Sequence, residues 1–160
     1  MLIKQITLRN FGNVKDQTLD FTKGITLFSG NNGEGKSTVI KAISLLLFNR
    51  SVGKLSEYIK WGEESFFISL DFSHEEKNYS LRFDYSEKKS EKVLTCLETS
   101  DIYENSAVVE FMDSLLGNLK RAMVSIMSFE NEIDLITTTP TERREYLKGI
   151  YDVNFKKELS

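Results

Sequence analysis

The 160-residue sequence predicts an α/β fold. Three observations support this prediction. Short runs with alternating apolar residues occur in the first two thirds of the chain, a glycine-rich loop separates an apolar run from a helix-like run, and helical spacing dominates the last third. With 40% hydrophobic residues, the chain can bury a core of its own, so we expect residues 1–160 to form a single domain.

The first 60 residues are expected to hold three strands, the glycine-rich loop and one helix. Apolar residues alternate over residues 2–8, and a second strand is expected at residues 17–21. The apolar run 25–28 is expected to be a third strand that leads directly into the loop. Residues 37–48 are apolar on most sides, which is typical of a helix packed on a sheet and covered by another layer.

Residues 61–100 are expected to form β-hairpins. The strand-like stretches are residues 66–72, 79–85 and 93–98, and the polar runs HEEKN and SEKKSEK separate them. Lys88, Lys89 and Lys92 alternate there with Glu87 and Glu91, a pattern typical of a solvated hairpin.

The last part of the chain is expected to be helical, over residues 108–116 and 119–127 and again from Pro140 onward. Thr139 can cap that last helix, Pro140 suits its first position, and Glu142 can close a capping box. We therefore divide the domain into residues 1–60, 61–100, 101–138 and 139–160, the last being the start of a long helix.

Composition excludes several classes of protein. The net charge of −3 is mild and both signs are interspersed, so no basic tail indicates a nucleic-acid partner. One cysteine, Cys96, allows no internal disulfide and no zinc spacing. No apolar run reaches membrane-spanning length and no signal peptide precedes the domain. We therefore expect a protein of the bacterial or phage-infected cytoplasm that does not contact a membrane.

The glycine-rich loop matches the pattern G-x-x-x-x-G-K-[ST] between an apolar strand and an apolar helix. Glycines let successive backbone N–H groups surround an anion, Lys36 adds a charge for the β- and γ-phosphates, and the Ser37 hydroxyl can bind Mg²⁺. The motif therefore predicts ATP and Mg²⁺ as cofactors and Lys36 as the catalytic cation. The expected nucleotide-binding residues are Asn31, Asn32, Gly33, Glu34, Gly35, Lys36, Ser37 and Thr38.

Two alternatives accompany this interpretation. The motif can be a chance match in a glycine-rich turn, although its position between strand and helix argues against that. ATP is favoured over GTP because no N-K-x-D motif is present. A complete ATPase also needs an acidic residue at the end of a second apolar strand. Asp71 does not fit, since Ile68, Leu70 and Phe72 alternate around it like one face of a hairpin, so ATP binding is expected to exceed hydrolysis.

The two ends of the chain together resemble the N-terminal half of the ATPase head of SbcC-like, SMC-like DNA-repair proteins. At the start, Ile6-Thr7-Leu8-Arg9-Asn10-Phe11 is followed by an apolar strand, GNNGEGKST and an Ile-Lys-Ala-Ile helix. Near the end, Phe129-Glu130-Asn131-Glu132-Ile133-Asp134 precedes Pro140 and an apolar helix, which is similar to the family's Q-loop and the helix that enters its coiled coil.

The resemblance implies lobe I of an ABC-type P-loop ATPase head, with an antiparallel β-subdomain and a helical part that leads to a coiled coil. It further implies a homodimer through ATP-bridged heads, an SbcD-like nuclease subunit and DNA as partners, and a role in double-strand-break repair and recombination. The family's signature motif, acidic pair and switch histidine belong to a second lobe. None of them is found in the sequence, so we expect that lobe to be absent and hydrolysis to require it and dimerisation.

Two positions depart from the family pattern. Glu130 aligns with the usual Q-loop glutamine and is a candidate Mg²⁺ ligand beside Ser37, the alternative being a solvated loop residue. Gly12 stands where many relatives place an arginine, so we assign it no base contact. Two other functions stay open: an SMC-type DNA-tethering ATPase subunit and a stand-alone nucleotide-binding regulator.

Overall fold

The computed structural model of the chain describes residues 1–49, 51, 53–116, 139–141 and 144. Met1–Met112 form one compact unit, and Asp113–Ser160 form a second. The Q-loop candidate Glu130, the expected helix at residues 119–127 and most of the helix from Pro140 lie outside the described residues. Of that last helix, Pro140, Thr141 and Arg144 are described and are helical. The predicted division into four segments of one head lobe stays a prediction.

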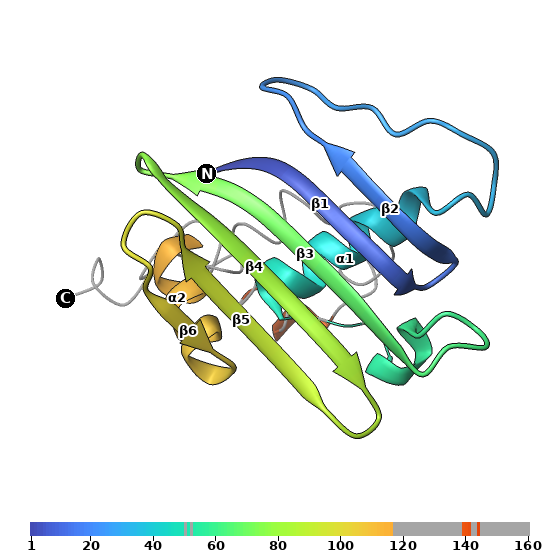
Figure 1. Cartoon of the computed structure of the whole chain (residues 1–160). Coiled ribbons are helices and arrows are strands. Elements are labelled where there is room, and N and C mark those ends of the chain that lie inside the picture. The colour runs from blue at the N-terminus through green and yellow to red at the C-terminus, as the bar shows by residue number, and fades with distance from the viewer. Residues whose placement is uncertain (50, 52, 117–138, 142–143, 145–160) are drawn as a thin grey trace. The chain divides into compact units, whose positions relative to one another are not determined.

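The first unit is built on a six-stranded antiparallel sheet in the order β2-β1-β3-β4-β5-β6 (Figure 1). The strands are β1 (Leu2–Phe11), β2 (Val14–Asp20), β3 (Ser65–His74), β4 (Lys77–Ser86), β5 (Ser90–Cys96) and β6 (Ile102–Glu104). Five of them confirm stretches expected from alternation, with small shifts at their ends. Strand β6 was missed, because three residues are too few to show a period.

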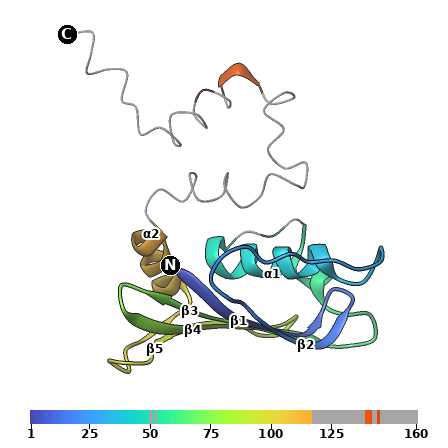
Figure 2. The same cartoon turned by 90° about the horizontal axis from the view of Figure 1, so that it is seen from above.

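One face of the sheet is covered and the other is open. The helices α1 (Lys36–Phe48) and α2 (Ser106–Leu116) lie on the same side of the sheet (Figure 2). Inward-facing residues of neighbouring strands are paired, for example Ile6 with Leu70 and Leu8 with Ile68, and all four are 0% exposed. The sheet therefore serves as a platform on which α1 rests, as its apolar sequence predicted.

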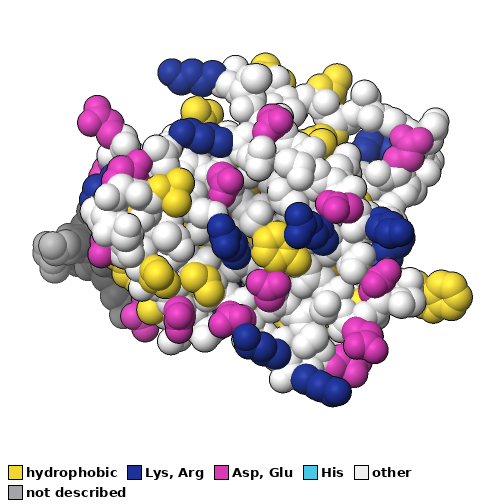
Figure 3. Space-filling model, viewed as in Figure 1, with side chains coloured by type: hydrophobic (Ala, Val, Ile, Leu, Met, Phe, Trp, Pro, Cys, Tyr) yellow, Lys and Arg dark blue, Asp and Glu magenta, His cyan; other side chains and the backbone are white. Residues whose placement is uncertain are grey.

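The open face carries intermixed charges (Figure 3). Arg9 lies 3.7 Å from Asp16, and its guanidinium is 5.6 Å from the centre of the Phe67 ring. Asp71 belongs to this side too, because the neighbouring residues Leu70 and Phe72 are buried on the other one. The expectation that Asp71 is no partner of the glycine-rich loop is thus confirmed, since the loop and α1 share the covered side.

The expected third strand at residues 25–28 is wrong. These residues have no strand conformation, and Ile25 is 100% exposed and Leu27 84% exposed. A strand needs a hydrogen-bonded neighbour, and no other strand in the described part of the chain pairs with this segment. An apolar run alone could not reveal that its pairing partner is missing.

Candidate functional site: the glycine-rich loop and the helix that follows it

The glycine-rich loop ends directly at the N-terminus of α1. Gly35 precedes the helix with a φ of 92°, and no side chain caps the first turn. The backbone N–H groups of that turn therefore keep no side-chain acceptor, and the positive end of the helix dipole faces the loop. Such a terminus is suited to an anion such as a phosphate group.

Gly35 is needed for steric reasons. A side chain at this position would adopt a disfavoured positive φ, and its Cβ would lie 3.0 Å from Val14 Cγ2 and 3.3 Å from Asn13 Oδ1. The glycine thus lets the loop lie against the turn between β1 and β2.

Lys36 lies at the centre of the loop. Its Nζ donates hydrogen bonds to the carbonyl oxygens of Gly30, at 2.8 Å, and of Asn31, at 2.6 Å. These bonds fold the ammonium group back over the loop, where it can reach an anion held by the same backbone. This position of the ammonium group is compatible with the sequence prediction that Lys36 is the catalytic cation.

Glu34 places a carboxylate inside the same loop. It accepts hydrogen bonds from the Asn31 side-chain amide, at 2.8 Å, and from the Asn31 backbone N–H, at 2.7 Å. These two hydrogen bonds hold the pKa of Glu34 below its usual value, and the bond from the side-chain amide has the larger effect. Glu34 therefore remains ionised and occupies a backbone N–H group that a phosphate could otherwise use.

The remaining predicted residues are arranged around this centre. Ser37 is exposed in the first turn of α1, a position from which its hydroxyl could bind Mg²⁺. Asn32 and Gly33 are exposed at the tip of the loop, and Thr38 points toward the β1–β2 turn. Among the described residues no group of three or more His, Cys, Asp or Glu side chains could hold a metal by itself.

Asn13, in the β1–β2 turn, is a site residue that sequence reasoning missed. Its side-chain amide donates to the Gly33 carbonyl oxygen, and its Oδ1 accepts from Thr38 Oγ1 at 2.8 Å. Its own backbone carbonyl accepts from Lys60 Nζ at 3.0 Å. No local motif marks Asn13, because all three partners are distant in the sequence.

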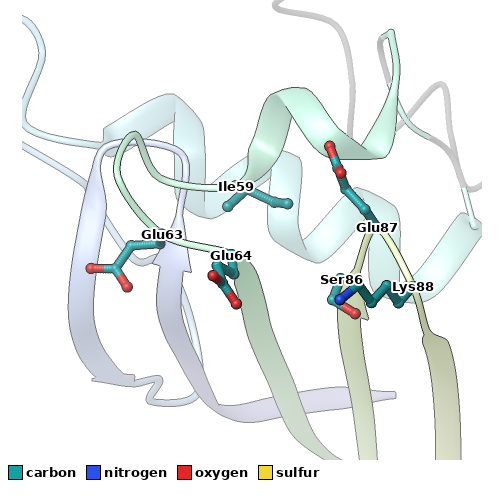
Figure 4. Close-up of a pocket in the computed structure, with 6 residues that line it drawn as sticks. All are labelled: Ile59, Glu63, Glu64, Ser86, Glu87 and Lys88. Atoms are coloured by element: carbon teal, nitrogen blue, oxygen red, sulfur yellow. The ribbon is translucent and has the colours of Figure 1, made fainter.

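Two hollows differ in their suitability for a phosphate. One of about 280 Å³ lies beside the loop and is lined by Glu34, Gly35 and Lys36 together with apolar residues of β2, α1 and the segment before the loop. The other, of about 400 Å³, lies between the turn before β3 and the β4–β5 hairpin (Figure 4). Its lining includes Glu63, Glu64 and Glu87. Lys88 lines it too. Because three carboxylates outnumber this one ammonium group, the larger hollow is less suited to a triphosphate than the hollow beside the loop.

Comparison with known proteins identifies the family. The sequence profile of the family described as AAA domain matches residues 5–160. The chain belongs to this AAA domain family. As expected, its fold is that of the N-terminal part of an SMC-like, ABC-type ATPase head: the domain superposes on a solved SMC ATPase structure with a TM-score of 0.72 at 20% identity, covering 94% of this chain and 99% of that one.

DNA-repair proteins are among the relatives of this AAA domain. It is 30% identical to the DNA replication and repair protein RecF of Thermoanaerobacter sp. over 99% of this chain and 41% of that protein. It is 28% identical to the DNA double-strand break repair Rad50 ATPase of Nanoarchaeum equitans over 100% of this chain and 21% of that protein. A solved structure of the recombination mediator RecF with ATP matches with a TM-score of 0.56 at 32% identity, covering 68% of this chain and 29% of that one.

The AAA domain therefore spans about two-fifths of the length of its RecF relatives. In the described part of the chain, no helix has both the length and the apolar character that crossing a bilayer requires.

Proposed function

We propose that the chain is the ATP-binding lobe of an ATPase subunit that acts in DNA recombination and repair. One observation carries the proposal: Lys36 and the uncapped N-terminus of α1 converge on the loop that matches the phosphate-binding motif. The likeness to a RecF structure solved with ATP supports the choice of ATP.

Mg²⁺ is proposed as the second cofactor, held by Ser37 and the phosphates of the nucleotide. When bound, the ion would neutralise charge on the β- and γ-phosphates. The chain's own groups bind and orient the triphosphate: Lys36 supplies a positive charge and the first turn of α1 supplies N–H donors. Glu130 is proposed as a further Mg²⁺ ligand from the sequence alone, because it lies outside the described residues.

The finer role that we propose is control of a partner nuclease at DNA ends, as in SbcC-like subunits, with two heads that pair around ATP. The Rad50 relative and the SMC structure described by ATP-driven dimerization support this proposal. A recombination-mediator role like that of RecF is the second candidate, because RecF relatives reach 35% identity over 92% of this chain.

The nucleotide site is tested by calorimetric titration of the chain with MgATP. Replacing Lys36 by alanine removes a charged donor to phosphate, worth about 2–3 kcal/mol, so we expect affinity to fall roughly 30- to 150-fold. Lys23→Ala, in an exposed turn, is the matched control and should bind as the wild type does. Unchanged affinity of Lys36→Ala would reject the site.

The two finer roles are separated by partner binding. Co-purification with an SbcD-like nuclease, and cleavage of DNA ends that depends on ATP, would support the first. ATP-dependent DNA binding without any association with the nuclease would support the mediator role instead.

A further inference from the structure

Lys92 of β5 is buried on the covered side of the sheet, contrary to the expectation of a solvated hairpin lysine. Lys92 is 5% exposed, and its ammonium group lies 5.8 Å from the centre of the Phe83 ring. The lysines and glutamates interspersed along this hairpin did not reveal the burial of Lys92. Residues of β5 alternate between the two faces, and Lys92 falls on the same face as the buried Leu94 and Cys96.

Lys92 contacts the C-terminal end of α1. Its Nζ donates to the Leu45 carbonyl oxygen at 3.1 Å and to Asn49 Oδ1 at 3.4 Å. Leu45 carries one of the last four carbonyl groups of the helix, which have no partner within it, and Asn49 is the C-cap residue. The last turn of α1 contains no basic residue of its own, so Lys92 supplies from another strand the cation that a helix C-terminus favours.

The two ends of α1 therefore have complementary partners. Its N-terminus faces the proposed phosphate site, and its C-terminus is bonded to the ammonium group of Lys92. The helix has 13 residues and is about 20 Å long, short enough to move as one rigid rod. A shift at its C-terminal end would be transmitted to the loop and to Lys36.

We propose that Lys92 is a positioning residue for the nucleotide site: by holding the C-terminal end of α1 on β5, it sets where the N-terminal end presents the phosphate-binding loop. This inference rests on the proposed nucleotide site and adds a residue to it from the far end of the helix.

The surroundings of Lys92 contain no described acidic partner. Burial is the cause that lowers its pKa to about 8. The charged residues beside Lys92 on the sheet fall on the open face, because they are in register with residues that point away from α1. They are Arg82 and Asp84 of β4, Glu91 of β5 and Glu104 of β6. Glu110 and Asp113 of α2 are exposed. Within α1 the charged residues are Lys36 and Lys41.

The test compares MgATP affinity of the full chain and its variants at about pH 7 and about pH 9. Lys92→Met keeps the length and removes the charge, so we expect about 5- to 10-fold weaker binding at the lower pH, in line with a cation at a helix C-terminus. The wild type should lose most of that advantage at the higher pH, as Lys92 deprotonates. Lys92→Arg stays charged and should not lose affinity with pH. Lys88→Met, an exposed lysine of the same hairpin, should behave as the wild type.

Amide hydrogen exchange without nucleotide provides a second readout. Faster exchange in both the last and the first turn of α1 in Lys92→Met is expected if the helix is held by Lys92. Faster exchange in the last turn alone, with unchanged MgATP affinity, would make Lys92 a local cap and overturn the positioning role.

The outcomes separate this inference from the function on which it rests. If the wild-type chain binds no MgATP, the proposed nucleotide site fails. Exchange in the first turn of α1 that is equal in Lys92→Met and the wild type would then overturn the positioning role as well. If the wild type binds and Lys92→Met binds equally well, only the role of Lys92 is rejected.

Discussion

At the scale of single residues, the loop depends on side chains that the motif does not specify. Asn13 joins the Gly33 carbonyl oxygen to the Thr38 hydroxyl, and Glu34 fastens the loop to Asn31. The motif specifies which residues can surround a phosphate, whereas the Asn13 contacts hold the loop in shape before any phosphate arrives. The Glu34 contact, by contrast, occupies a backbone N–H group that a phosphate would have to free. Preformed geometry favours binding because less conformational freedom is lost when the ligand is bound.

Asn13→Ala should therefore weaken nucleotide binding without unfolding the chain. Two hydrogen bonds to the loop and α1 are lost at an exposed position, and we expect roughly 3- to 10-fold lower MgATP affinity. Asn78→Ala is a suitable control, because it also removes an asparagine side-chain hydrogen bond, but one outside the loop. The Asn78 side-chain amide donates to Glu98 at 2.7 Å, at the start of β4. Equal affinity of both variants in a calorimetric titration would show that Asn13 has no part in the site.

At the scale of elements, α1 is held by packing along its length and by Lys92 at its end. Residues 42–48 of α1 are all buried, and Ser44 among them satisfies its hydroxyl by donating to the Ile40 carbonyl oxygen at 2.9 Å. Packing against the strands determines which face of α1 lies on the sheet. Movement along the helix axis is opposed by directional contacts such as those of Lys92.

The burial of Lys92 should make stability depend on pH. Its pKa is about 8 in the folded chain, whereas the ordinary pKa of a lysine side chain is 10.5. Between these two values the unfolded chain binds more protons, so the free energy of unfolding rises with pH across this window. Below about pH 8 the full cost of burying the charge is present, about 3 kcal/mol before its hydrogen bonds are counted.

Lys92→Met should remove this dependence. Urea unfolding at about pH 7 is expected to show a variant as stable as the wild type or more stable, by up to about 2 kcal/mol, because the cost of burying the charge disappears. The difference should shrink as the pH approaches about 10. A variant much less stable than the wild type at neutral pH would show that Lys92 is a stabilising residue.

At the scale of the whole molecule, the exposed segment at residues 25–28 stands out. It is apolar, it pairs with no strand in the described part of the chain, and it directly precedes the proposed nucleotide site. Because unpaired apolar segments promote association, we expect the chain to self-associate through this segment.

The double variant Ile25→Ser, Leu27→Ser should reduce self-association with little effect on stability. Both side chains are at least 84% exposed, and exposed substitutions usually change stability by less than about 0.5 kcal/mol. Leu8→Ser, at a position that is 0% exposed, should by contrast unfold the chain. Sedimentation velocity and thermal melting measure the two effects; association that is unchanged in the double variant would place the contact elsewhere.

The sequence by itself determined the features that depend on neighbouring residues. The phosphate-binding motif, the helix after it and five of the strands were all predicted, because local spacing and alternation directly reflect backbone geometry. The same reasoning correctly set Asp71 apart from the site.

Only the tertiary structure decided what depends on distant residues. It showed that no strand among the described residues pairs with residues 25–28, that Asn13 holds the loop, and that Lys92 lies buried under the end of α1. The physical reason is the same in each case. Strand pairing, burial and long-range hydrogen bonds are set by which chain segments meet in space, and a run of residues carries no record of its partners.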